Sequence, residues 1–279
     1  MGVGGGITTD IVGFTASIYK RGMKFGFVPT TLLAQTDASI GGKNGVNFNA
    51  YKNILGTINQ PEWIAICTDV LQTLPQEEFK AGIAEVLKTF ILFDKEYYNK
   101  AVEYFSQVSA RYSDGSTAVE ENIDTLTDII KKCAEYTSGV VERDEFEKGE
   151  RRLLNLGHTF AHAIEKLRGE QGVMHGHAVS MGIVIAAKVG EMLHNGKNAE
   201  KGCFSHKLIE DLHRVGLPAL LQDYPLTSDL KVSHLAEAIK KDKKDEGSNI
   251  HFIVPYGVED VKDTIVGLEK LKEIANDLC

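Results

Sequence analysis

The segment RRLLNLGHTFAHAIE, residues 151–165, combines polar side chains that carry chemistry with many apolar ones. Its guanidinium, its amide and its two imidazoles are spaced four, three and four residues apart: Arg151, Asn155, His158 and His162. If the segment is one helix, all four share one face. Because apolar residues flank that face, burying it costs free energy unless something binds there. The pattern therefore predicts a ligand-binding face, and a solvated surface with one core histidine is the alternative.

Metal binding is one chemistry that this face offers. His158 and His162 stand four residues apart, as do the two histidines that hold zinc on a helix. Metalloproteases have a glutamate directly after the first histidine, whereas Thr159 stands there in this chain, which argues against that class. His175, in the segment MHGH, is a third candidate ligand at the start of a further helix.

A carboxylate and an ammonium lie three residues apart in GIAEVLK, residues 82–88. Glu85 and Lys88 therefore share one face of an otherwise apolar helix. An ordinary surface ion pair is one interpretation. The other is an oxygen ligand for a divalent ion, because a carboxylate among apolar residues needs a partner.

Two loops in the first third of the chain are rich in hydrogen-bond donors. One is PTTLLAQTDASIGGK, residues 29–43, which is followed by Lys52 and Asn53. The other is GGGITTD, residues 4–10, which leads into a helix. Hydroxyls, backbone N–H groups and ammonium groups suit phosphate or ribose oxygens. The glycine spacing before Lys43 is not that of a P-loop.

The elements that must position these residues fall into two groups. Up to about residue 75, glycine turns and short apolar runs predict strands at 25–29 and 63–67 and a helix over 11–21. From residue 76 on, helical spacing of apolar residues predicts helices over 79–93, 97–108, 119–141, 153–167, 178–193, 203–215 and 232–241. The one convincing late strand is 250–255. We therefore predict an α/β domain, residues 1–76, followed by an all-α domain, residues 77–279.

Composition limits the partners of the chain. Its 39 acidic and 31 basic residues give a net charge of −8 over 279 residues, which argues against nucleic acid and anionic membranes. No apolar run reaches the roughly 18–20 residues that span a bilayer. The four cysteines are scattered and form no CxxC pair, which predicts free thiols and a cytoplasmic location. A small anionic molecule is the expected partner.

Together these segments resemble the 3-dehydroquinate synthases, a family of the sugar phosphate cyclase superfamily. The shared motifs occur in family order over nearly the whole chain: GGGxxxD, GFTA, PTTLLA, DASIGGK, TLP, AEVxK, NxGHTFxHAIE, HGxAV and DKK. The resemblance implies a partial Rossmann-like N-terminal domain and a mostly helical, metal-binding C-terminal domain. It also implies a homodimer.

The activity that the resemblance implies is the conversion of 3-deoxy-D-arabino-heptulosonate 7-phosphate to 3-dehydroquinate and phosphate, in the shikimate pathway. Bound NAD oxidises a ring hydroxyl and later reduces the ketone back. Phosphate is eliminated between these steps, and an aldol closure follows. The implied cofactors are therefore NAD and a divalent metal ion, zinc or cobalt.

The resemblance also assigns roles to residues. The metal ligands would be Glu85, His158 and His175, whereas His162 would contact the substrate or shuttle protons. The other groups at the substrate would be Asp37, Lys43, Lys88, Arg151, Asn155, Lys243 and Lys244. The NAD-binding positions would be Gly6, Ile7, Thr8, Thr9, Asp10, Thr30, Thr31, Asp37, Lys43, Lys52, Asn53, Val70, Leu71, Gln72 and Thr73.

The chain departs from the family pattern at two places. His177 stands where glutamate is frequent in the family, and it is an alternative metal ligand. The family has a substantial segment before the glycine turn, whereas three residues precede Gly4 here, so we expect an incomplete NAD half-site. Three alternatives stay open: a sister cyclase acting on sedoheptulose 7-phosphate or glucose 6-phosphate, an iron-type alcohol dehydrogenase, and a non-catalytic remnant.

Overall fold

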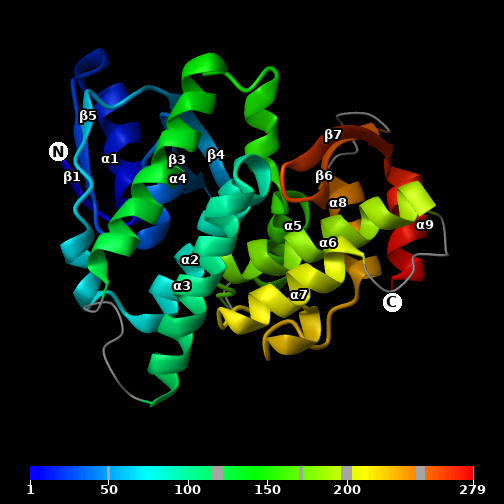
Figure 1. The fold of residues 1–279 in the computed structure, drawn as a ribbon. Helices are drawn as coiled ribbons and strands as arrows, with labels where there is room; N and C mark the ends of the chain where they lie inside the picture. Colours follow the sequence, from blue (N-terminus) through cyan, green and yellow to red (C-terminus); the bar gives the residue numbers. More distant parts are fainter. Residues whose placement is uncertain (49–50, 115–121, 170–171, 196–202, 243–248, 279) are drawn as a thin grey trace. The chain divides into compact units, whose positions relative to one another are not determined.

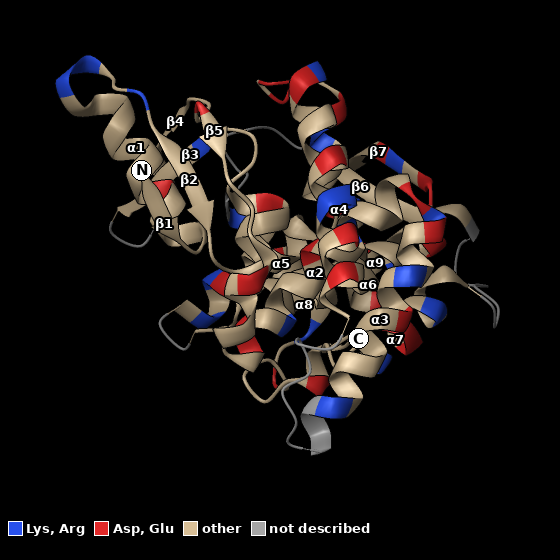
Figure 2. Ribbon diagram, turned by 60° about the vertical axis from the view of Figure 1, so that its left-hand side comes forward, with Lys and Arg blue, Asp and Glu red and all other residues tan. Residues whose placement is uncertain are grey.

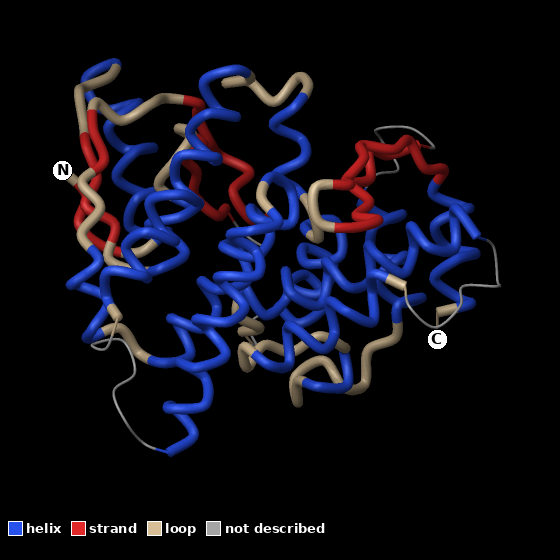
Figure 3. Tube along the Cα trace, viewed as in Figure 1, coloured by secondary structure: helices blue, strands red, loops and turns tan. Residues whose placement is uncertain are grey.

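The computed structural model describes residues 1–48, 51–114, 122–169, 172–195, 203–242 and 249–278 (Figure 1). Its contacts divide the chain into two compact units. Unit 1 holds residues 1–86 and 110–151, and unit 2 holds residues 87–109 and 152–279. Strands occur in three separate sheets, which Figure 3 shows in red among the helices.

A three-stranded parallel sheet begins unit 1. Its strands are β1 (Gly2–Gly4), β2 (Gly26–Pro29) and β5 (Trp63–Ile64), in the order β1-β2-β5. Parallel strands need a crossover, which α1 (Gly6–Ile18) and the 3-10 turn η1 (Tyr19–Arg21) supply between the first two. Ala16 of α1 packs on Phe25 and Phe27 to form a small core against the sheet. These strands carry no charged residue and are tan in Figure 2.

A widened helical turn follows β2. This turn, η2 (Ala34–Ala38), is a π-helix, a form that often marks functional sites. The helix α4 (Ile123–Arg143) packs beside it, and the hydroxyl of Thr137 donates a hydrogen bond to the carbonyl of Thr36 at 3.2 Å. An antiparallel hairpin comes next, formed by β3 (Lys43–Phe48) and β4 (Tyr51–Ile58). The 3-10 turn η3 (Thr68–Thr73) completes this part.

The long helix α2 (Gln76–Phe93) begins in unit 1 and continues into unit 2. Residues 81–92 of α2 are all buried, as expected for a helix that is apolar on every side. Gly82 allows its close approach to the segment before η2, because a Cβ on Gly82 would lie 2.6 Å from the Cβ of Leu32. The buried helix α2 therefore provides a rigid support for any polar residue it carries.

Unit 2 is mostly helical. Its elements are α3 (Lys95–Asp114) up to residue 109, η4 (Glu150–Asn155) from residue 152 on, α5 (His158–Arg168), α6 (His175–Asn195), α7 (Phe204–Arg214), η6 (Leu221–Asp223), α8 (Val232–Asp242), β6 (Asn249–Gly257), β7 (Asp260–Gly267) and α9 (Leu268–Asp277). The helix α6 is central, since it packs against α5, α7, α9 and the antiparallel β6-β7 hairpin. Among the described residues it is the one helix long and apolar enough to cross a membrane, but 78% of that stretch is buried within the protein. Its apolar character therefore fits a core helix.

The sequence predicted most helices within a few residues of their ends, but two expectations were wrong. Residues 151–165 are not one helix, because the 3-10 turn η4 ends at Asn155 and α5 starts at His158. Gly157 separates them with φ +80°, so the four polar residues do not share one helical face. The segment 250–255 is not the one late strand, since β7 pairs with it. The hairpin β3-β4 was not predicted. The start of the helix expected at 119 lies outside the described residues.

The domain boundary between residues 76 and 77 stays a prediction. Residue 76 is the first residue of α2, so the predicted boundary coincides with a change from turns to a long helix. The two compact units are not continuous in sequence, because 110–151 returns to unit 1.

We predict that the contact between α5 and α6 sets a limit on side-chain size. A Cβ on Gly182 would lie 2.2 Å from the carbonyl oxygen of Gly157, which is backbone and cannot swing aside. Gly182→Ala should therefore lower the free energy of unfolding by about 1–3 kcal/mol, although alanine favours helix. Urea unfolding followed by circular dichroism measures this change.

Gly139→Ala in α4 is the matched control. A Cβ there would meet only the flexible tip of Arg143, at 3.3 Å. This variant should be neutral or more stable by up to about 1 kcal/mol. Equal losses for the two variants would contradict the packing described for Gly182.

Candidate functional site

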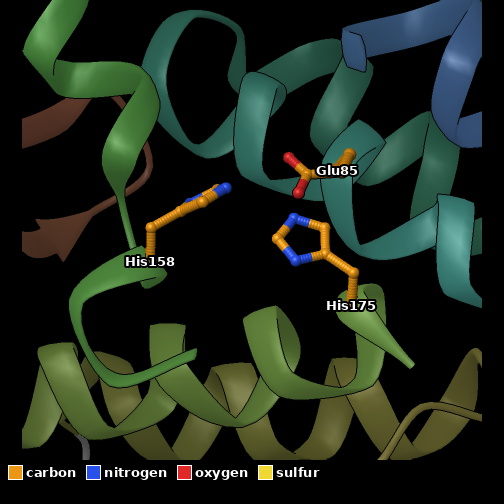
Figure 4. A group of neighbouring side chains, drawn as sticks. All are labelled: Glu85, His158 and His175. Carbon is orange, nitrogen blue, oxygen red and sulfur yellow. The ribbon is translucent and has the colours of Figure 1, made fainter. Parts of the chain in front are cut away.

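A carboxylate and two imidazoles meet at one point in the structure. Glu85 lies on α2, His158 is the first residue of α5, and His175 is the first residue of α6. One ligand atom from each side chain lies within 4.8 Å of the other two. Figure 4 shows the carboxylate and both rings pointing toward one another. The arrangement is that of a metal site with three protein ligands.

Glycine geometry places His158 beside His175. Gly157 precedes His158 with φ +80°, a conformation that L side chains rarely adopt. Its carbonyl lies against Gly182 of α6, and a Cβ on Gly157 would lie 2.7 Å from Ile183. The two helices pack against each other, and the imidazole centroids of their first residues are 5.3 Å apart.

Both imidazoles are oriented by an acceptor at Nδ1. The Nδ1 of His175 lies 2.8 Å from Oε1 of Glu165, and the Nδ1 of His158 lies 3.1 Å from the carbonyl of Leu156. A proton on Nδ1 leaves Nε2 as the nitrogen with a free lone pair, which is how metal-bound histidines are usually held. The sequence analysis missed Glu165. Its spacing could have revealed it, because a carboxylate seven residues after His158 lies on the same face of one helix, two turns further along.

The donor set fits a zinc or cobalt ion. Two imidazole nitrogens and one carboxylate are the ligands of many catalytic zinc sites, which keep a fourth position for water or substrate. Glu85 is completely buried, and the two histidines are partly exposed. A fully buried carboxylate needs a cation or strong hydrogen-bond donors close by, and a divalent ion at this position would supply the charge.

Three further polar residues that the sequence predicted, His162, Lys88 and Asn155, lie on the elements that carry this group or directly before them. His162 is exposed, and its centroid is 5.6 Å from that of His158 and 6.4 Å from that of His175. It does not belong to the three-residue group. Lys88 follows Glu85 by one turn of α2 and is 1% exposed. Asn155 is the last residue of η4 and is partly buried.

His177, the alternative ligand, is not part of the group either. It is 3% exposed, and its ring packs edge-on against Tyr224 with a centroid distance of 5.0 Å. Its position two residues after His175 on α6 turns it toward another face of that helix. A structural role therefore explains the burial of this histidine.

Arg151 is buried in unit 1 and holds two loops together. Its guanidinium donates to the carbonyl of Gly41 at 2.7 Å and to the carbonyl of Glu145. Burial lowers the pKa of Arg151, and the acidic groups near it, Glu147 and Asp37 first, act in the opposite direction. Arginine remains charged at any ordinary pH. The residue thus fixes the turn before Lys43 by charge-assisted hydrogen bonds.

Asp144 organises the loop that carries Arg151, and the sequence analysis missed it. Its carboxylate accepts hydrogen bonds from the backbone N–H groups of Lys148, Gly149 and Arg151, at 2.8, 2.8 and 3.0 Å. These bonds, the one from Arg151 first, lower the pKa of Asp144. In the same loop Glu147 forms an ion pair with Lys43. The predicted residues Lys43 and Arg151 therefore belong to one polar network of unit 1.

The glycine turn between β1 and α1 is a tight cradle. Gly5 caps α1, and a Cβ on it would lie 2.9 Å from the methyl group of Thr31. The backbone N–H of Thr30 donates to the carbonyl of Gly4, and the hydroxyl of Thr9 donates to that of Gly6. The first N–H groups of a helix lack partners within the helix, so they favour an anion such as a pyrophosphate. The turn therefore fits the phosphates of NAD.

The remaining predicted positions vary in how accessible they are. Ile7 is 80% exposed at the start of α1, whereas Leu71 in η3 is fully buried, so its side chain is not available to a ligand. Asn53 is exposed in β4 with φ +50°, and its N–H donates to the side chain of Asn47. Lys243 and Lys244 lie outside the described residues, as does the side chain of Lys52.

Solved structures with this architecture include two cyclising synthases and several dehydrogenases. The fold matches that of 2-epi-5-epi-valiolone synthase from Streptomyces hygroscopicus, solved with NAD+ and Zn2+ bound, at a TM-score of 0.79 and 26% identity, over 99% of this chain and 72% of that one. It also matches 2-deoxy-scyllo-inosose synthase, solved with carbaglucose-6-phosphate, NAD+ and Co2+. The TM-score is 0.76 and the sequence identity 25%, over 100% of this chain and 73% of that one. An NADH-dependent butanol dehydrogenase from Thermotoga maritima shares the fold alone, with a TM-score of 0.65 and 13% identity over 100% of this chain and 75% of that one.

Sequence comparison is more specific. The N-terminal family model of 3-dehydroquinate synthase matches residues 1–81, and the C-terminal model matches residues 82–245. The 3-dehydroquinate synthase of Pyrococcus furiosus is 43% identical over an alignment of 281 residues, which covers 99% of this chain and 75% of that protein. The 3-dehydroquinate synthase of Alkaliphilus metalliredigens is 37% identical, over 96% of this chain and 70% of that protein. The chain belongs to the 3-dehydroquinate synthase family.

We predict that one divalent ion binds per chain and depends on three side chains. Replacing Glu85 or His158 with alanine removes one of three ligands, so purified protein should lose nearly all bound zinc or cobalt. Inductively coupled plasma mass spectrometry gives the stoichiometry. His162→Ala is the control, because His162 stands outside the group and should leave the metal content unchanged. Loss of metal in the control alone would refute this assignment.

Glu165 should tune the affinity for the ion. Glu165→Gln keeps the size of the side chain but weakens its hydrogen bond to Nδ1 of His175. Losing such an orienting partner typically weakens metal binding about 10–100-fold. Competition with a fluorescent zinc chelator measures the change, and an unaltered dissociation constant would exclude an orienting role.

Proposed function

We propose that this chain is a 3-dehydroquinate synthase that converts 3-deoxy-D-arabino-heptulosonate 7-phosphate to 3-dehydroquinate and phosphate. The meeting of Glu85, His158 and His175 in one group, in a chain of this family, is the observation that carries the proposal. Support also comes from the identity of 37–44% to relatives with that name. The proposal includes the class, a phosphate-eliminating carbon–oxygen lyase of the shikimate pathway.

The two cofactors have separate places in the proposal. Glu85, His158 and His175 would hold the zinc or cobalt ion, and the turn at Gly5 with the donors of Thr30 and Thr31 would hold NAD. When bound, the ion polarises a substrate oxygen, and NAD accepts a hydride and returns it. A sister cyclase solved with NAD+ and Co2+ uses the same pair of cofactors. No net oxidation of the substrate is expected.

The side chains around the metal group would bind and orient the substrate. Lys88 projects from the same helix as Glu85, one turn later, and offers an ammonium to a phosphate or carboxylate oxygen. His162 is exposed beside His158 and can take and return a proton. Asn155, Asp37 and the two lysines at 243 and 244 stay proposed substrate contacts. Holding a flexible anion in one conformation is itself a large part of the rate acceleration.

Arg151 has a positioning role in this proposal. Two of its N–H groups are engaged by the carbonyls of Gly41 and Glu145, so the guanidinium shapes the turn that leads to Lys43. The turn carries the buried glycines Gly41 and Gly42, with φ of +105° and +68°, a conformation that other residues rarely adopt. We therefore expect Arg151 to act on the substrate site through Lys43 as well as by its own charge.

We propose a cytoplasmic homodimer whose partner is a small phosphorylated sugar acid, with no role for nucleic acid or membranes. Cys67, Cys133 and Cys203, the cysteines within the described residues, are not in disulfide bonds, in keeping with a reducing compartment.

We predict that the purified chain releases phosphate from 3-deoxy-D-arabino-heptulosonate 7-phosphate when NAD and zinc or cobalt are supplied. Absorbance at about 340 nm should stay flat, because the hydride is returned. His162→Asn should lower kcat about 10²–10⁴-fold, the usual contribution of a proton-transferring group, while the metal content stays at the wild-type value. A coupled phosphate assay measures the rate.

A substrate panel separates this function from its alternatives. Sedoheptulose 7-phosphate and glucose 6-phosphate test the sister cyclases, and a steady rise of NADH with an alcohol tests a dehydrogenase. A protein that binds NAD and metal yet turns over none of these phosphates would overturn the proposal. Isothermal titration with NAD shows whether that condition is met.

A further inference from the structure

A cavity lies in unit 2, beside the second half of α6. It has a volume of about 190 Å³ and is lined by Val184, Ile185, Lys188, Ala219, Leu220, Leu221, Gln222, Lys231, Val232 and Leu278. Seven of these ten residues are aliphatic. The polar ones are two lysines and one glutamine, so the cavity combines an apolar wall with positive charge.

Lys188 is the unusual residue of this cavity. It lies in the middle of α6, half-buried among apolar residues, and its ammonium makes no hydrogen bond or ion pair within the part of the chain that the structure describes. Burial lowers the pKa of Lys188, and the negative charges of Glu191 and Asp223 act in the opposite direction. Leaving an ammonium half-buried without a direct partner costs free energy.

Both of the nearby carboxylates already accept hydrogen bonds from other groups. Glu191 accepts hydrogen bonds from the backbone N–H and the hydroxyl of Ser205, both at 2.8 Å. Asp223 accepts from the backbone N–H groups of Ala219 and Leu220, at 2.9 and 2.7 Å, and lies 2.7 Å from a ring nitrogen of His213. These bonds tie both carboxylates to the elements around the cavity, and neither forms an ion pair with Lys188 within the residues that the structure describes.

We propose that this cavity binds a small apolar monocarboxylate, with its carboxylate at Lys188 and its apolar body against Val184, Leu221 and Val232. Lys231, exposed at the start of α8, supplies a second positive charge to the same anion. A carboxylate would form a charge-assisted hydrogen bond with the lysine and remove the cost of leaving it unpaired. A polyanion is disfavoured, because most of the wall is aliphatic and two acidic groups stand close behind it.

The volume of the cavity limits the size of the ligand, and the distance along α6 separates the cavity from the metal group. The cavity equals the liquid volume of roughly six water molecules at about 30 Å³ each, which admits one ring and a carboxylate. Lys188 follows His175 by 13 residues on α6, or about 20 Å at 1.5 Å per residue. Binding here therefore needs neither the metal ion nor the proposed catalytic activity.

Benzoate is a suitable probe, with benzamide and benzylamine as a neutral and a cationic molecule of the same shape. Saturation-transfer NMR on the full chain should give benzoate a dissociation constant in the low millimolar range or below. Benzamide and benzylamine should bind at least tenfold more weakly, which is a difference of about 1.4 kcal/mol. Thermal unfolding should shift upward with benzoate, because a ligand that binds the folded state stabilises it.

Variants of Lys188 decide the assignment. Lys188→Met keeps the aliphatic stem and removes the charge, so benzoate should bind at least tenfold more weakly, whereas Lys188→Arg should stay within about threefold of wild type. Lys188→Gln repeats the test if the methionine variant does not fold. Lys270→Met is the control, because Lys270 is an exposed partner of Glu273 elsewhere on the surface. Equal binding of benzoate and benzamide, or unchanged binding by the Met and Gln variants, overturns the proposal.

Discussion

The close approach of Gly182 on α6 to the carbonyl of Gly157 is the contact on which the helical unit's site depends. It joins α5 and α6 at a distance that a side chain on Gly182 would not permit. Because His158 directly follows Gly157, this contact sets where α5 begins and which way the first imidazole points. His175 begins the partner helix, seven residues before Gly182.

Burial and hydrogen bonding then make the site rigid. Glu85 stands on a helix that is buried over residues 81–92, so its own backbone is held by packing on all sides. Glu165 and the carbonyl of Leu156 fix the two rings through Nδ1. Rigid elements that hold ligands before the metal arrives lower the cost of ordering them at binding. The polar network of unit 1 uses the same means, with Asp144 and Arg151 fixing the loops around Lys43.

Local sequence predicted the parts of this protein that depend on short-range patterns. Helical periodicity located most helices, and the short apolar runs located β2 and β5. The hairpin β3-β4 was missed because its strands carry glycines and polar residues and lack clear alternation, so their pairing is stabilised by contacts that the sequence pattern does not display. The break at Gly157 was missed because a glycine inside an apolar periodic segment is usually tolerated in a helix.

Residue types and motifs by themselves determined the candidate groups for chemistry: a glutamate on an apolar helix, two histidines of separate motifs, and donor-rich glycine turns. From spacing alone, His158 and His162 were equal candidates as a metal pair, because both stand on one helix. The family resemblance assigned Glu85 and His175 to one group with His158, and the tertiary structure alone showed that their ligand atoms meet within 4.8 Å of one another. The reason is physical: ligation requires atoms within a few ångströms, and that proximity comes from helix packing, which no single segment encodes.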